Sequence, residues 1–457
     1  MPSTGDSGAL RMAYASDTIA AVATATGRSA VGIVRVSGPG VDRVMRGILG
    51  RALPCRQAVV ASFHDAAGHA IDQGLGLYFP APASYTGEDI LELQGHGGPV
   101  VLQLLLRRCL ELGARLAAPG EFTQRAFLND KLDLAQAESV ADLIDANTSE
   151  AARCAIRSLQ GAFSERIDSL VRALVELRTL VEATLDFPEE EIEFLKPARL
   201  ASTLHKIERE LDEVMTASRQ GSLLRDGLRI VILGEPNVGK SSLLNRLAGE
   251  EVAIVTDIPG TTRDTIHQAI DLDGIPVFVV DTAGLRTSDD PVEKLGIARA
   301  WQASEKADLA VVVCDATQAC EAAEDILRRL PPRVPVVTVM NKIDLLGEAP
   351  HVDGGLSGSR VWMSAKNGLG LDLLRGALLA AGGWRGGAEG LYLARARHLA
   401  ALDEARASIE NAVHEERGVE LVAEHLRLAQ SALSRIVGDY TADDLLGEIF
   451  GRFCIGK

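Results

Sequence analysis

The segment Gly234–Ser241 (GEPNVGKS) has a spacing of glycine, lysine and serine that can bind phosphate. It matches the pattern GxxxxGK[ST], follows the apolar run LRIVIL and precedes a helical run. Glycines let backbone N–H groups converge on phosphate oxygens, and a helix N-terminus adds positive dipole. We expect Lys240 to reach the β- and γ-phosphates and the Ser241 hydroxyl to bind Mg²⁺. The alternative is a chance glycine turn, which the strand–loop–helix context disfavours.

Two further motifs lie between this loop and Asn341. Asp281–Gly284 (DTAG) ends another apolar run, where a carboxylate can hold the Mg²⁺ shell through water. In Thr261–Asp264 (TTRD), Thr262 is expected to ligate Mg²⁺ when a γ-phosphate is present. For Thr261, simple capping of a turn is the alternative.

The segment Asn341–Asp344 (NKID) predicts the choice of base. The Asp344 carboxylate can accept from N1–H and the exocyclic amine of guanine, whereas adenine would leave it unpaired. Ser364–Lys366 (SAK) is expected to close the base pocket with a backbone amide. The motifs in this order predict a GTPase. The residues that we expect to contact GTP are Asn237, Val238, Gly239, Lys240, Ser241, Ser242, Thr256, Thr261, Thr262, Asp281, Thr282, Ala283, Gly284, Asn341, Lys342, Asp344, Ser364, Ala365 and Lys366.

The residue after DTAG is Leu285, not the glutamine that orients the attacking water in Ras-type enzymes. Hydrolysis therefore needs another group to position water and another source of positive charge. Asp289, Asp290 and Glu293 follow in the same segment and are acidic candidates.

Apolar periodicity predicts the elements that position these motifs. Between about residues 225 and 384, buried-strand runs alternate with helix-length stretches, which indicates a largely parallel sheet covered on both faces. On either side, apolar residues recur at helical spacing, from Leu170 to Leu185 and from Val422 to Val437. We interpret these flanks as one helical domain interrupted by an insertion. Residues 17–113 are typical of a small α/β domain of alternating strands and helices, with a helix that opens at Pro99.

Composition limits the class of protein. The 457 residues suggest about three domains, and 47% hydrophobic content excludes global disorder. The net charge of −16 repels phosphate backbones, so contact with nucleic acid should be local or provided by a partner. No apolar run approaches the ~20 residues of a membrane helix, so no membrane role is expected. Six cysteines without a CxxC pair favour a reducing, cytoplasmic location.

Along nearly its full length the chain resembles the MnmE (TrmE) family of tRNA modification GTPases. The resemblance rests on AVGIVRVSG, SYTGEDILELQGHGGP, PGEFTQRAFLNDKLDLAQAE, the phosphate loop, TDIPGTTRD, DTAG, NKID and the terminal FCIGK. It implies an N-terminal α/β tetrahydrofolate-binding domain, a central helical domain, and a Ras-like P-loop α/β G domain inserted into the helical domain. The bounds expected are 1–131 for the dimerising N-terminal domain, 132–222 and 385–457 for the two helical parts, and 223–384 for the G domain.

The resemblance also implies a potassium-dependent GTPase that is activated when G domains dimerise. By motif, Asn237, Thr256, Ile258 and Thr261 would supply oxygens to K⁺. A monovalent cation beside the β–γ bridge would neutralise developing charge. Glu293 and Lys240 would be the catalytic residues, and Glu293 would position the attacking water. From its neighbours alone, an ordinary exposed acid is the alternative for Glu293.

Four residues match the family's folate contacts, namely Arg35, Glu92, Lys131 and Lys457. A carboxylate suits the donor edge of a pterin, and cations suit an acidic glutamate tail. For Arg35 and Lys131 taken alone, solvation at the surface is the alternative. Two other residues are noted. Cys454 is a possible functional thiol or a buried small hydrophobe. His96, without a visible partner carboxylate at useful spacing, is interpreted as a turn residue, with a catalytic histidine as the alternative.

The resemblance implies partners and a reaction. An FAD-dependent partner, MnmG (GidA), would form a heterotetrameric or larger complex with a homodimer of this chain and act on tRNA. The pair would install a carboxymethylaminomethyl or aminomethyl group at C5 of the wobble uridine. The one-carbon donor would be 5-formyl- or 5,10-methylene-tetrahydrofolate. The alternative function is a switch GTPase of ribosome assembly or of the translation-factor class.

Overall fold

The computed structural model describes residues 17–186, 197–250, 266–280, 304–318, 321–355, 358–387, 390–415, 418–438, 443–451, 453 and 455–456. The chain divides into two compact units. Unit 1 comprises residues 1–141 and 433–457, and unit 2 comprises residues 142–432. The two ends of the chain therefore share one unit, and the part between them forms the other.

Unit 1 is built on a six-stranded sheet in the order β3-β4-β5-β2-β1-β6. All neighbours pair antiparallel except β1 and β6. The alternation of strands and helices expected here holds only in part, because β3, β4 and β5 follow one another without a helix. The strands are β1 (Ile19–Val22), β2 (Ser29–Ser37), β3 (Val59–His64), β4 (Ala70–Phe79), β5 (Ile90–Gly97) and β6 (Arg115–Leu116).

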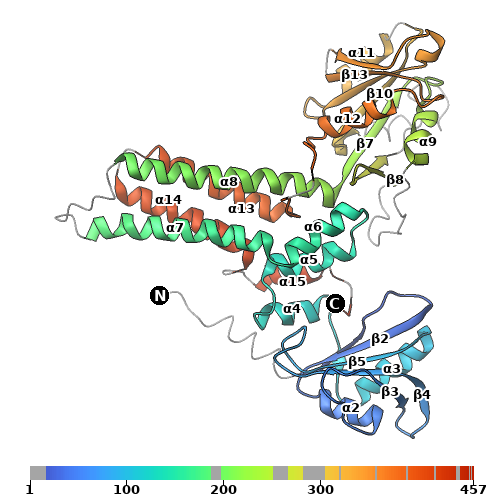
Figure 1. Cartoon of the computed structure of the whole chain (residues 1–457), viewed down its shortest axis with the longest axis vertical. Helices are drawn as coiled ribbons and strands as arrows, with labels where there is room; N and C mark the ends of the chain where they lie inside the picture. Colours follow the sequence, from blue (N-terminus) through green and yellow to red (C-terminus); the bar gives the residue numbers. More distant parts are fainter. Residues whose placement is uncertain are drawn as a thin grey trace. The chain divides into compact units, whose positions relative to one another are not determined.

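The two faces of this sheet are covered differently. The helices α2 (Val41–Leu49) and α3 (Pro99–Glu111) bury an apolar cluster against one face (Figure 1). The helix expected at Pro99 is confirmed, with proline at its first position. On the other face, Phe122 of α4 (Glu121–Leu128) packs with Ile19 and Ala21 of β1. Because side chains alternate along a strand, Arg35 and Glu92 lie on this second face as well.

The C-terminal segment completes unit 1. Phe450 of α15 (Asp443–Gly451) packs in an apolar cluster with Leu134 of α5 (Leu134–Ile144). Further along, Ile455 forms a β-bridge with Pro119, and Gly456 lies so close to the Val22 carbonyl that a Cβ would overlap it. Gly456 is therefore placed at the end of β1.

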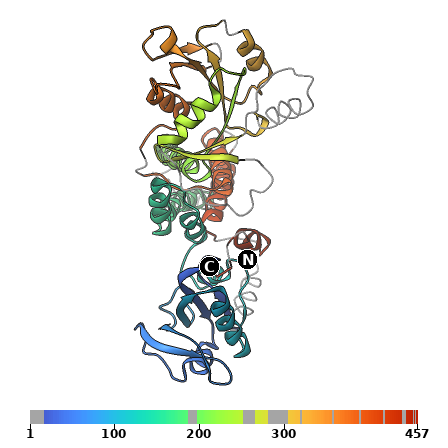
Figure 2. The same cartoon turned by 90° about the vertical axis from the view of Figure 1, so that its right-hand side faces the viewer.

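Unit 2 contains helices from two distant parts of the sequence, and the four longest of them run side by side in Figures 1 and 2. The helices are α6 (Ser149–Leu159), α7 (Ala162–Asp186), α8 (Pro197–Asp226), α13 (Ala396–Val413) and α14 (Val419–Val437). The predicted apolar stripes are buried, including Leu174 in α7 and Leu426 in α14. An α/β body follows α8 and ends before α13, so the predicted insertion is confirmed. Among the helices of the described residues, none has the length and apolar character needed to cross a bilayer.

The inserted body holds a seven-stranded sheet in the order β12-β13-β11-β10-β7-β9-β8. The predicted parallel pairing is confirmed for the five central strands, whereas β8 and β12 are antiparallel edges that sequence reasoning did not single out. The strands are β7 (Leu228–Gly234), β8 (Ile266–Leu272), β9 (Ile275–Val280), β10 (Leu309–Asp315), β11 (Val336–Asn341), β12 (His351–Gly355) and β13 (Gly358–Met363). Helices α9 (Lys240–Glu250) and α12 (Leu371–Ala381) pack on one face, and α11 (Glu321–Arg329) on the other.

Candidate functional site

The glycine-rich loop joins β7 to α9 at the carboxyl edge of the sheet. β7 ends at Gly234 and α9 begins at Lys240, so the predicted strand–loop–helix context is confirmed. Gly239 has φ +102°, and a Cβ there would overlap the Asn341 amide nitrogen. Gly234 has φ +149°, and a Cβ there would overlap the Val313 carbonyl. Both positions therefore require glycine because of backbone conformation and close approach.

Lys240 lies inside this loop. Its Nζ donates to the carbonyls of Gly234 at 2.9 Å and of Glu235 at 2.6 Å. Burial lowers the pKa of the Lys240 ammonium, and the Glu235 carboxylate opposes that shift. Ser241 and Ser242 follow on the first turn of α9 and are exposed. The lysine and both hydroxyl side chains are thus gathered at one helix N-terminus, where the dipole favours an anion.

Asn341, at the end of β11, connects three of the predicted motifs. Its Nδ2 donates to the Val238 carbonyl of the glycine-rich loop at 2.7 Å, and its Oδ1 accepts from the Ala365 amide at 2.9 Å. The side chain is buried, with 3% of the residue exposed. Buried amides are normally fully hydrogen-bonded, so Asn341 fixes the spacing of the loop, NKID and SAK.

Asp344 lies in the short 3₁₀-helix η2 (Ile343–Leu345). Ser364 Oγ donates to Asp344 Oδ1 at 2.6 Å, which ties the carboxylate to the SAK segment. Lys342, between Asn341 and Asp344, has φ +73° and forms an ion pair with Asp315 at 2.7 Å. The NKID and SAK residues are therefore brought together at the same edge as the glycine-rich loop.

Sequence reasoning missed two residues of this site. Arg246 of α9 donates from Nη2 to the Lys366 carbonyl at 2.9 Å and holds the SAK backbone against the phosphate-loop helix. Asp315, the last residue of β10, is the partner of Lys342. A signal for Asp315 was present, because an acidic residue at the carboxyl end of a strand next to NKID lies at the edge where ligands bind.

Some predicted site residues lie outside the described residues. Several would act at the γ-phosphate or at K⁺ and the others near folate, and their roles stay predictions. They are Thr256, Ile258, Thr261, Thr262, Asp281, Thr282, Ala283, Gly284, Glu293, Cys454 and Lys457.

In unit 1, Arg35 and Glu92 are direct neighbours on β2 and β5. Arg35 Nη2 lies 2.9 Å from Glu92 Oε1, and both side chains are mostly buried. The Arg35 guanidinium also lies over the rings of Tyr85 and Phe122, at 5.6 and 5.7 Å from their centroids. Cation–π contacts of this kind favour a fixed guanidinium. The structure thus brings together the two expected residues, an acid and a base, with two aromatic rings that the sequence did not single out. Surface solvation alone does not describe Arg35, whose side chain is mostly buried.

Lys131, a third member of the predicted folate set, and Gly456 lie in the same part of unit 1. The stem of Lys131 lies beside Gly87, two residues beyond Tyr85, because a Cβ at Gly87 would meet Lys131 Cγ at 3.3 Å. Gly456, next to the undescribed Lys457, lies against Val22, which pairs with Val34 beside Arg35. These contacts bring the loop around Tyr85, Lys131 just after α4, and Gly456 to one corner of the sheet.

A buried network of charges supports that corner. Arg125, with 1% of the residue exposed, donates to Asp17, Glu88 and Glu121 at 2.6 to 3.3 Å. Glu121 also accepts from Arg115 at 2.6 Å. Burial would raise the pKa of Glu121, but hydrogen bonds from Arg115, the Ala118 amide and Arg125 outweigh it and lower that pKa. The network ties α4 to the loop that carries Tyr85 and Glu88.

The interpretation of His96 as a turn residue without a partner is wrong. His96 lies within β5, and its Nδ1 is 2.8 Å from Asp72 Oδ1. The His96 backbone amide also donates to Asp72 Oδ2 at 2.7 Å. Asp72 lies on β4, 24 residues away, so the pair depends on strand register, which sequence spacing does not reveal.

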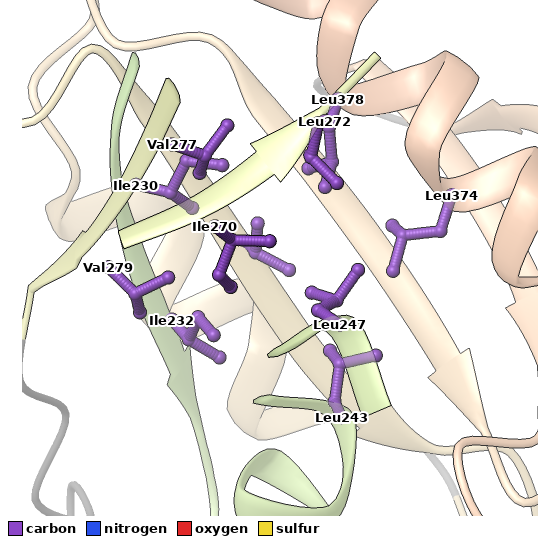
Figure 3. A pocket seen from close by; sticks show the side chains of 11 residues that line it. Ile230, Ile232, Leu243, Leu247, Ile270, Leu272, Val277, Val279, Leu374 and Leu378 are labelled. Carbon is purple, nitrogen blue, oxygen red and sulfur yellow. The ribbon is translucent and has the colours of Figure 1, made fainter. Parts of the chain in front are cut away.

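One cavity lies inside the inserted body, between the sheet and helices α9 and α12 (Figure 3). Its walls are entirely aliphatic, with Ile230, Leu243 and Leu374 among them, and its volume is about 10 Å³. A space of this size holds at most one water, and a water needs polar partners that these walls lack. The cavity is a gap in core packing and does not suit a ligand.

The sheet order, the glycine-rich loop on β7 and the NKID and SAK segments at the same edge define a P-loop GTPase. Comparison with known proteins gives the family. The model described as "MnmE helical domain" matches residues 134–454, and that of the "GTP-binding protein TrmE N-terminus" matches residues 18–131. The chain is 58% identical over 447 residues to the tRNA modification GTPase MnmE of Nitrosomonas europaea, which covers 96% of this chain and 99% of that protein. It is 60% identical over 442 residues to the MnmE of Thiobacillus denitrificans, covering 96% and 98%. The chain belongs to the MnmE (TrmE) family of tRNA modification GTPases.

Proposed function

We propose that this GTPase, with the FAD-dependent partner MnmG (GidA), modifies C5 of the wobble uridine of certain tRNAs. The product would be a carboxymethylaminomethyl or aminomethyl group, with its one-carbon unit drawn from a tetrahydrofolate derivative. The proposal rests on two sites within one chain of this family. Unit 2 carries the glycine-rich loop held by Asn341, and unit 1 carries the Arg35–Glu92 pair. Family membership favours tRNA modification over the ribosome-assembly alternative.

Nucleoside analysis tests this function directly. We expect tRNA from a strain that lacks the gene to lose the modified wobble uridine, and the intact gene to restore it. A variant with Lys240→Ala should not restore it, because the lysine would no longer contact the phosphates. Unchanged nucleosides in the deletion strain would contradict the proposal.

In the nucleotide site, we assign the triphosphate to the loop from Asn237 to Ser242. Backbone amides and Lys240 would bind the phosphates, and the Ser241 hydroxyl would ligate Mg²⁺. The exposed Ser241 at the helix N-terminus fits this role, since Mg²⁺ takes oxygen ligands and relies on substrate phosphates. Thr262 and Asp281, the other protein groups expected at Mg²⁺, lie outside the described residues.

For the base, we assign guanine recognition to Asp344, held by Ser364. Asp344→Asn replaces one acceptor with a donor, so it should clash with the N1–H of guanine and weaken GTP binding by at least about 100-fold. Fluorescent guanine nucleotide titration measures this change. Unchanged selectivity for guanine over adenine would displace Asp344 from the role.

We also propose that K⁺ accelerates hydrolysis in a dimer of G domains. Asn237, the one described member of the expected ligand set, is exposed on the glycine-rich loop with φ +63°. Its amide oxygen is a hard donor of the type that binds alkali cations, and the site fits the ion in that respect. When bound, K⁺ would supply positive charge beside the β–γ bridge, and Glu293 would position water.

The potassium proposal is tested by GTP turnover in KCl and NaCl at equal ionic strength. We expect faster turnover in KCl, and Asn237→Ala should remove the difference while nucleotide binding persists. Equal rates in the two salts in the wild type would count against it. A parallel light-scattering measurement with a transition-state analogue would report whether K⁺ promotes association of G domains.

We propose that the Arg35–Glu92 corner binds the folate. Glu92 can accept from the donor edge of a pterin, and Tyr85 and Phe122 offer ring faces beside it. Lys131 and Lys457 would bind the glutamate tail. Calorimetric titration of 5-formyltetrahydrofolate should give a saturable signal in the wild type that Arg35→Ala abolishes. If the wild type did not bind 5-formyltetrahydrofolate, the proposed folate site would be wrong, whereas the GTPase assignment would be unaffected.

The same sheet face supports a homodimer of the N-terminal domain. Val31, Val60 and Leu75 are exposed by 53%, 64% and 37% and lie on the face that carries Arg35. Exposed apolar side chains grouped on one face are typical of an interface. Sedimentation of the full chain, with Val60→Asp as the variant, tests this surface: we expect a dimer in the wild type and a monomer in the variant.

From the net charge of −16 we infer that MnmG would supply most of the basic surface for tRNA. We expect weak tRNA binding by this chain alone and strong binding by the complex, in the cytoplasm, where we place the reaction. Tight binding by the isolated chain with a steep salt dependence would contradict this.

A further inference from the structure

Asp315 is a charged group of the nucleotide edge that none of the expected motifs includes. It is the last residue of β10 and lies opposite Asn341 of β11 in the sheet register. The Ala316 amide donates to the Asn341 carbonyl at 2.8 Å, so the ends of the two strands are joined by backbone as well. Its side chain is 11% exposed. A carboxylate so placed at the carboxyl edge of a parallel sheet faces the ligand side of the fold.

Every oxygen of this carboxylate is used. Oδ1 accepts from the Thr317 amide at 3.0 Å and from the Thr317 hydroxyl at 2.7 Å. Oδ2 accepts from Lys342 Nζ at 2.7 Å. Burial would raise the pKa of Asp315, but the bonds from Lys342 and Thr317 outweigh it and hold that pKa below its ordinary value. Thr317 thus orients the carboxylate, and the carboxylate fixes the lysine.

The lysine that Asp315 holds is the link between the two base-site residues of NKID. Lys342 has φ +73° and ψ +30°, a left-handed conformation that is unfavourable for a residue with a Cβ. Directly after it, η2 begins, and the Leu345 amide donates to the Lys342 carbonyl at 3.0 Å. The backbone at Lys342 therefore sets the distance between Asn341 and Asp344. Asn341 is itself hydrogen-bonded to the glycine-rich loop.

We propose that Asp315 is a positioning residue of the guanine-nucleotide site. It anchors the Lys342 side chain and so stabilises the left-handed turn. This turn holds Asn341 and Asp344 at the positions that the base site requires. The inference deepens the nucleotide site proposed above and rests on it. Asp315 touches neither phosphate nor base in this scheme, so its removal should affect the lifetime of the bound nucleotide and not the hydrolytic step.

Asp315→Asn in the full chain provides the main test, because the amide retains the shape of the side chain and loses its charge. We expect release of fluorescent GDP to be about 5- to 20-fold faster and KM for GTP to rise to a similar extent, with kcat at saturating GTP and Mg²⁺ unchanged. Asp308→Asn is the matched control. Asp308 lies just before β10, its carboxylate accepts from the Arg229 amide at 2.9 Å, and it should leave release unchanged.

A double-mutant cycle with Lys342→Met isolates the pair. If Asp315 acts through Lys342, Asp315→Asn should have almost no further effect on release once Lys342 has been replaced. Thr317→Val, at an exposed position where folding is not at stake, should reproduce a smaller part of the faster release. Asp315→Glu, which retains the charge, should fall between the wild type and Asp315→Asn.

Three results would overturn the proposal. They are unchanged release in Asp315→Asn and Thr317→Val, a fall in kcat with unchanged KM, or full additivity of Asp315→Asn and Lys342→Met. A wild-type chain that bound no guanine nucleotide would instead overturn the proposed function itself, so the two failures are distinguishable.

Discussion

Thr148 and Gly274 are joined by a hydrogen bond in which Thr148 Oγ1 donates to the Gly274 carbonyl at 2.8 Å. Thr148 is the N-cap of α6 and also accepts from the Ala151 amide, whereas Gly274 lies at the turn between β8 and β9. Gly274 has φ +88°, and a Cβ there would meet Glu150 Cγ at 2.7 Å. The helical part of unit 2 thus contacts the hairpin of β8 and β9. In the sequence, TTRD comes just before β8 and DTAG just after β9.

Thr148→Val should therefore weaken this junction. Valine keeps the volume of the side chain but loses the cap of α6 and leaves the Gly274 carbonyl unpaired, which should lower the free energy of unfolding by about 1–2 kcal/mol. Chemical denaturation measures the change. Thr179→Val is the control: Thr179 is exposed in α7 and donates only to Val175 of its own helix, so its effect should stay within about 0.5 kcal/mol. Equal losses of unfolding free energy in both variants would show that the Thr148–Gly274 hydrogen bond does not stabilise the fold more than an exposed threonine does.

Arg125→Met should be among the most destabilising single changes in unit 1. The guanidinium is buried, and its removal leaves Asp17, Glu88 and Glu121 without a shared cation, which typically costs about 3–5 kcal/mol. Arg46→Met is the matched control, since Arg46 and Asp42 form an exposed i,i+4 pair that should contribute less than about 1 kcal/mol. Urea unfolding of both variants checks the contrast, and a loss below about 1 kcal/mol in Arg125→Met would contradict it.

The same network predicts an acid-sensitive fold. The pKa of Glu121 lies below its ordinary value of 4.5 in the folded chain, because hydrogen bonds from Arg115, Ala118 and Arg125 outweigh burial. The carboxylate therefore stabilises the folded state above the ordinary pKa, and this contribution is lost as the pH falls through the lowered value. Unfolding free energies from about pH 7 to about pH 3 should show the loss beginning below about pH 5. Glu121→Gln should be less stable at neutral pH and have a shallower acid dependence; parallel curves would refute the assignment.

Two glycines near α9 make a matched pair for the nucleotide site. Gly239→Ala places a Cβ at φ +102° against the Asn341 amide nitrogen, so the loop must shift and the affinity for GDP should fall at least about tenfold. At Gly249, within α9, a Cβ meets nothing within 4 Å, and alanine should raise helix stability by up to about 1 kcal/mol without changing affinity. Fluorescent GDP titration and thermal unfolding of both variants test the difference. If Gly239→Ala bound GDP as the wild type does, the close approach to Asn341 would have no role in the site.

Local pattern was enough to find the nucleotide site. LRIVIL, the glycine turn and the helical run SLLNRLAG predict a strand, a loop and a helix because each depends on neighbours in sequence. NKID and SAK follow at strand ends, and parallel strands place their carboxyl ends at one edge. The helical stripes around Leu174 and Leu426 likewise needed only a period of about 3.6 residues.

Tertiary structure alone decided which side chains meet. Asp315 is 27 residues from Lys342, Asp72 is 24 from His96, and Arg125 is 108 from Asp17. Each pair depends on strand register or on packing between distant segments, and a shift of one residue in register would turn every side chain to the opposite face. Residue types and spacing thus determined the chemistry of this chain, whereas the partners that hold those residues in place follow only from long-range pairing.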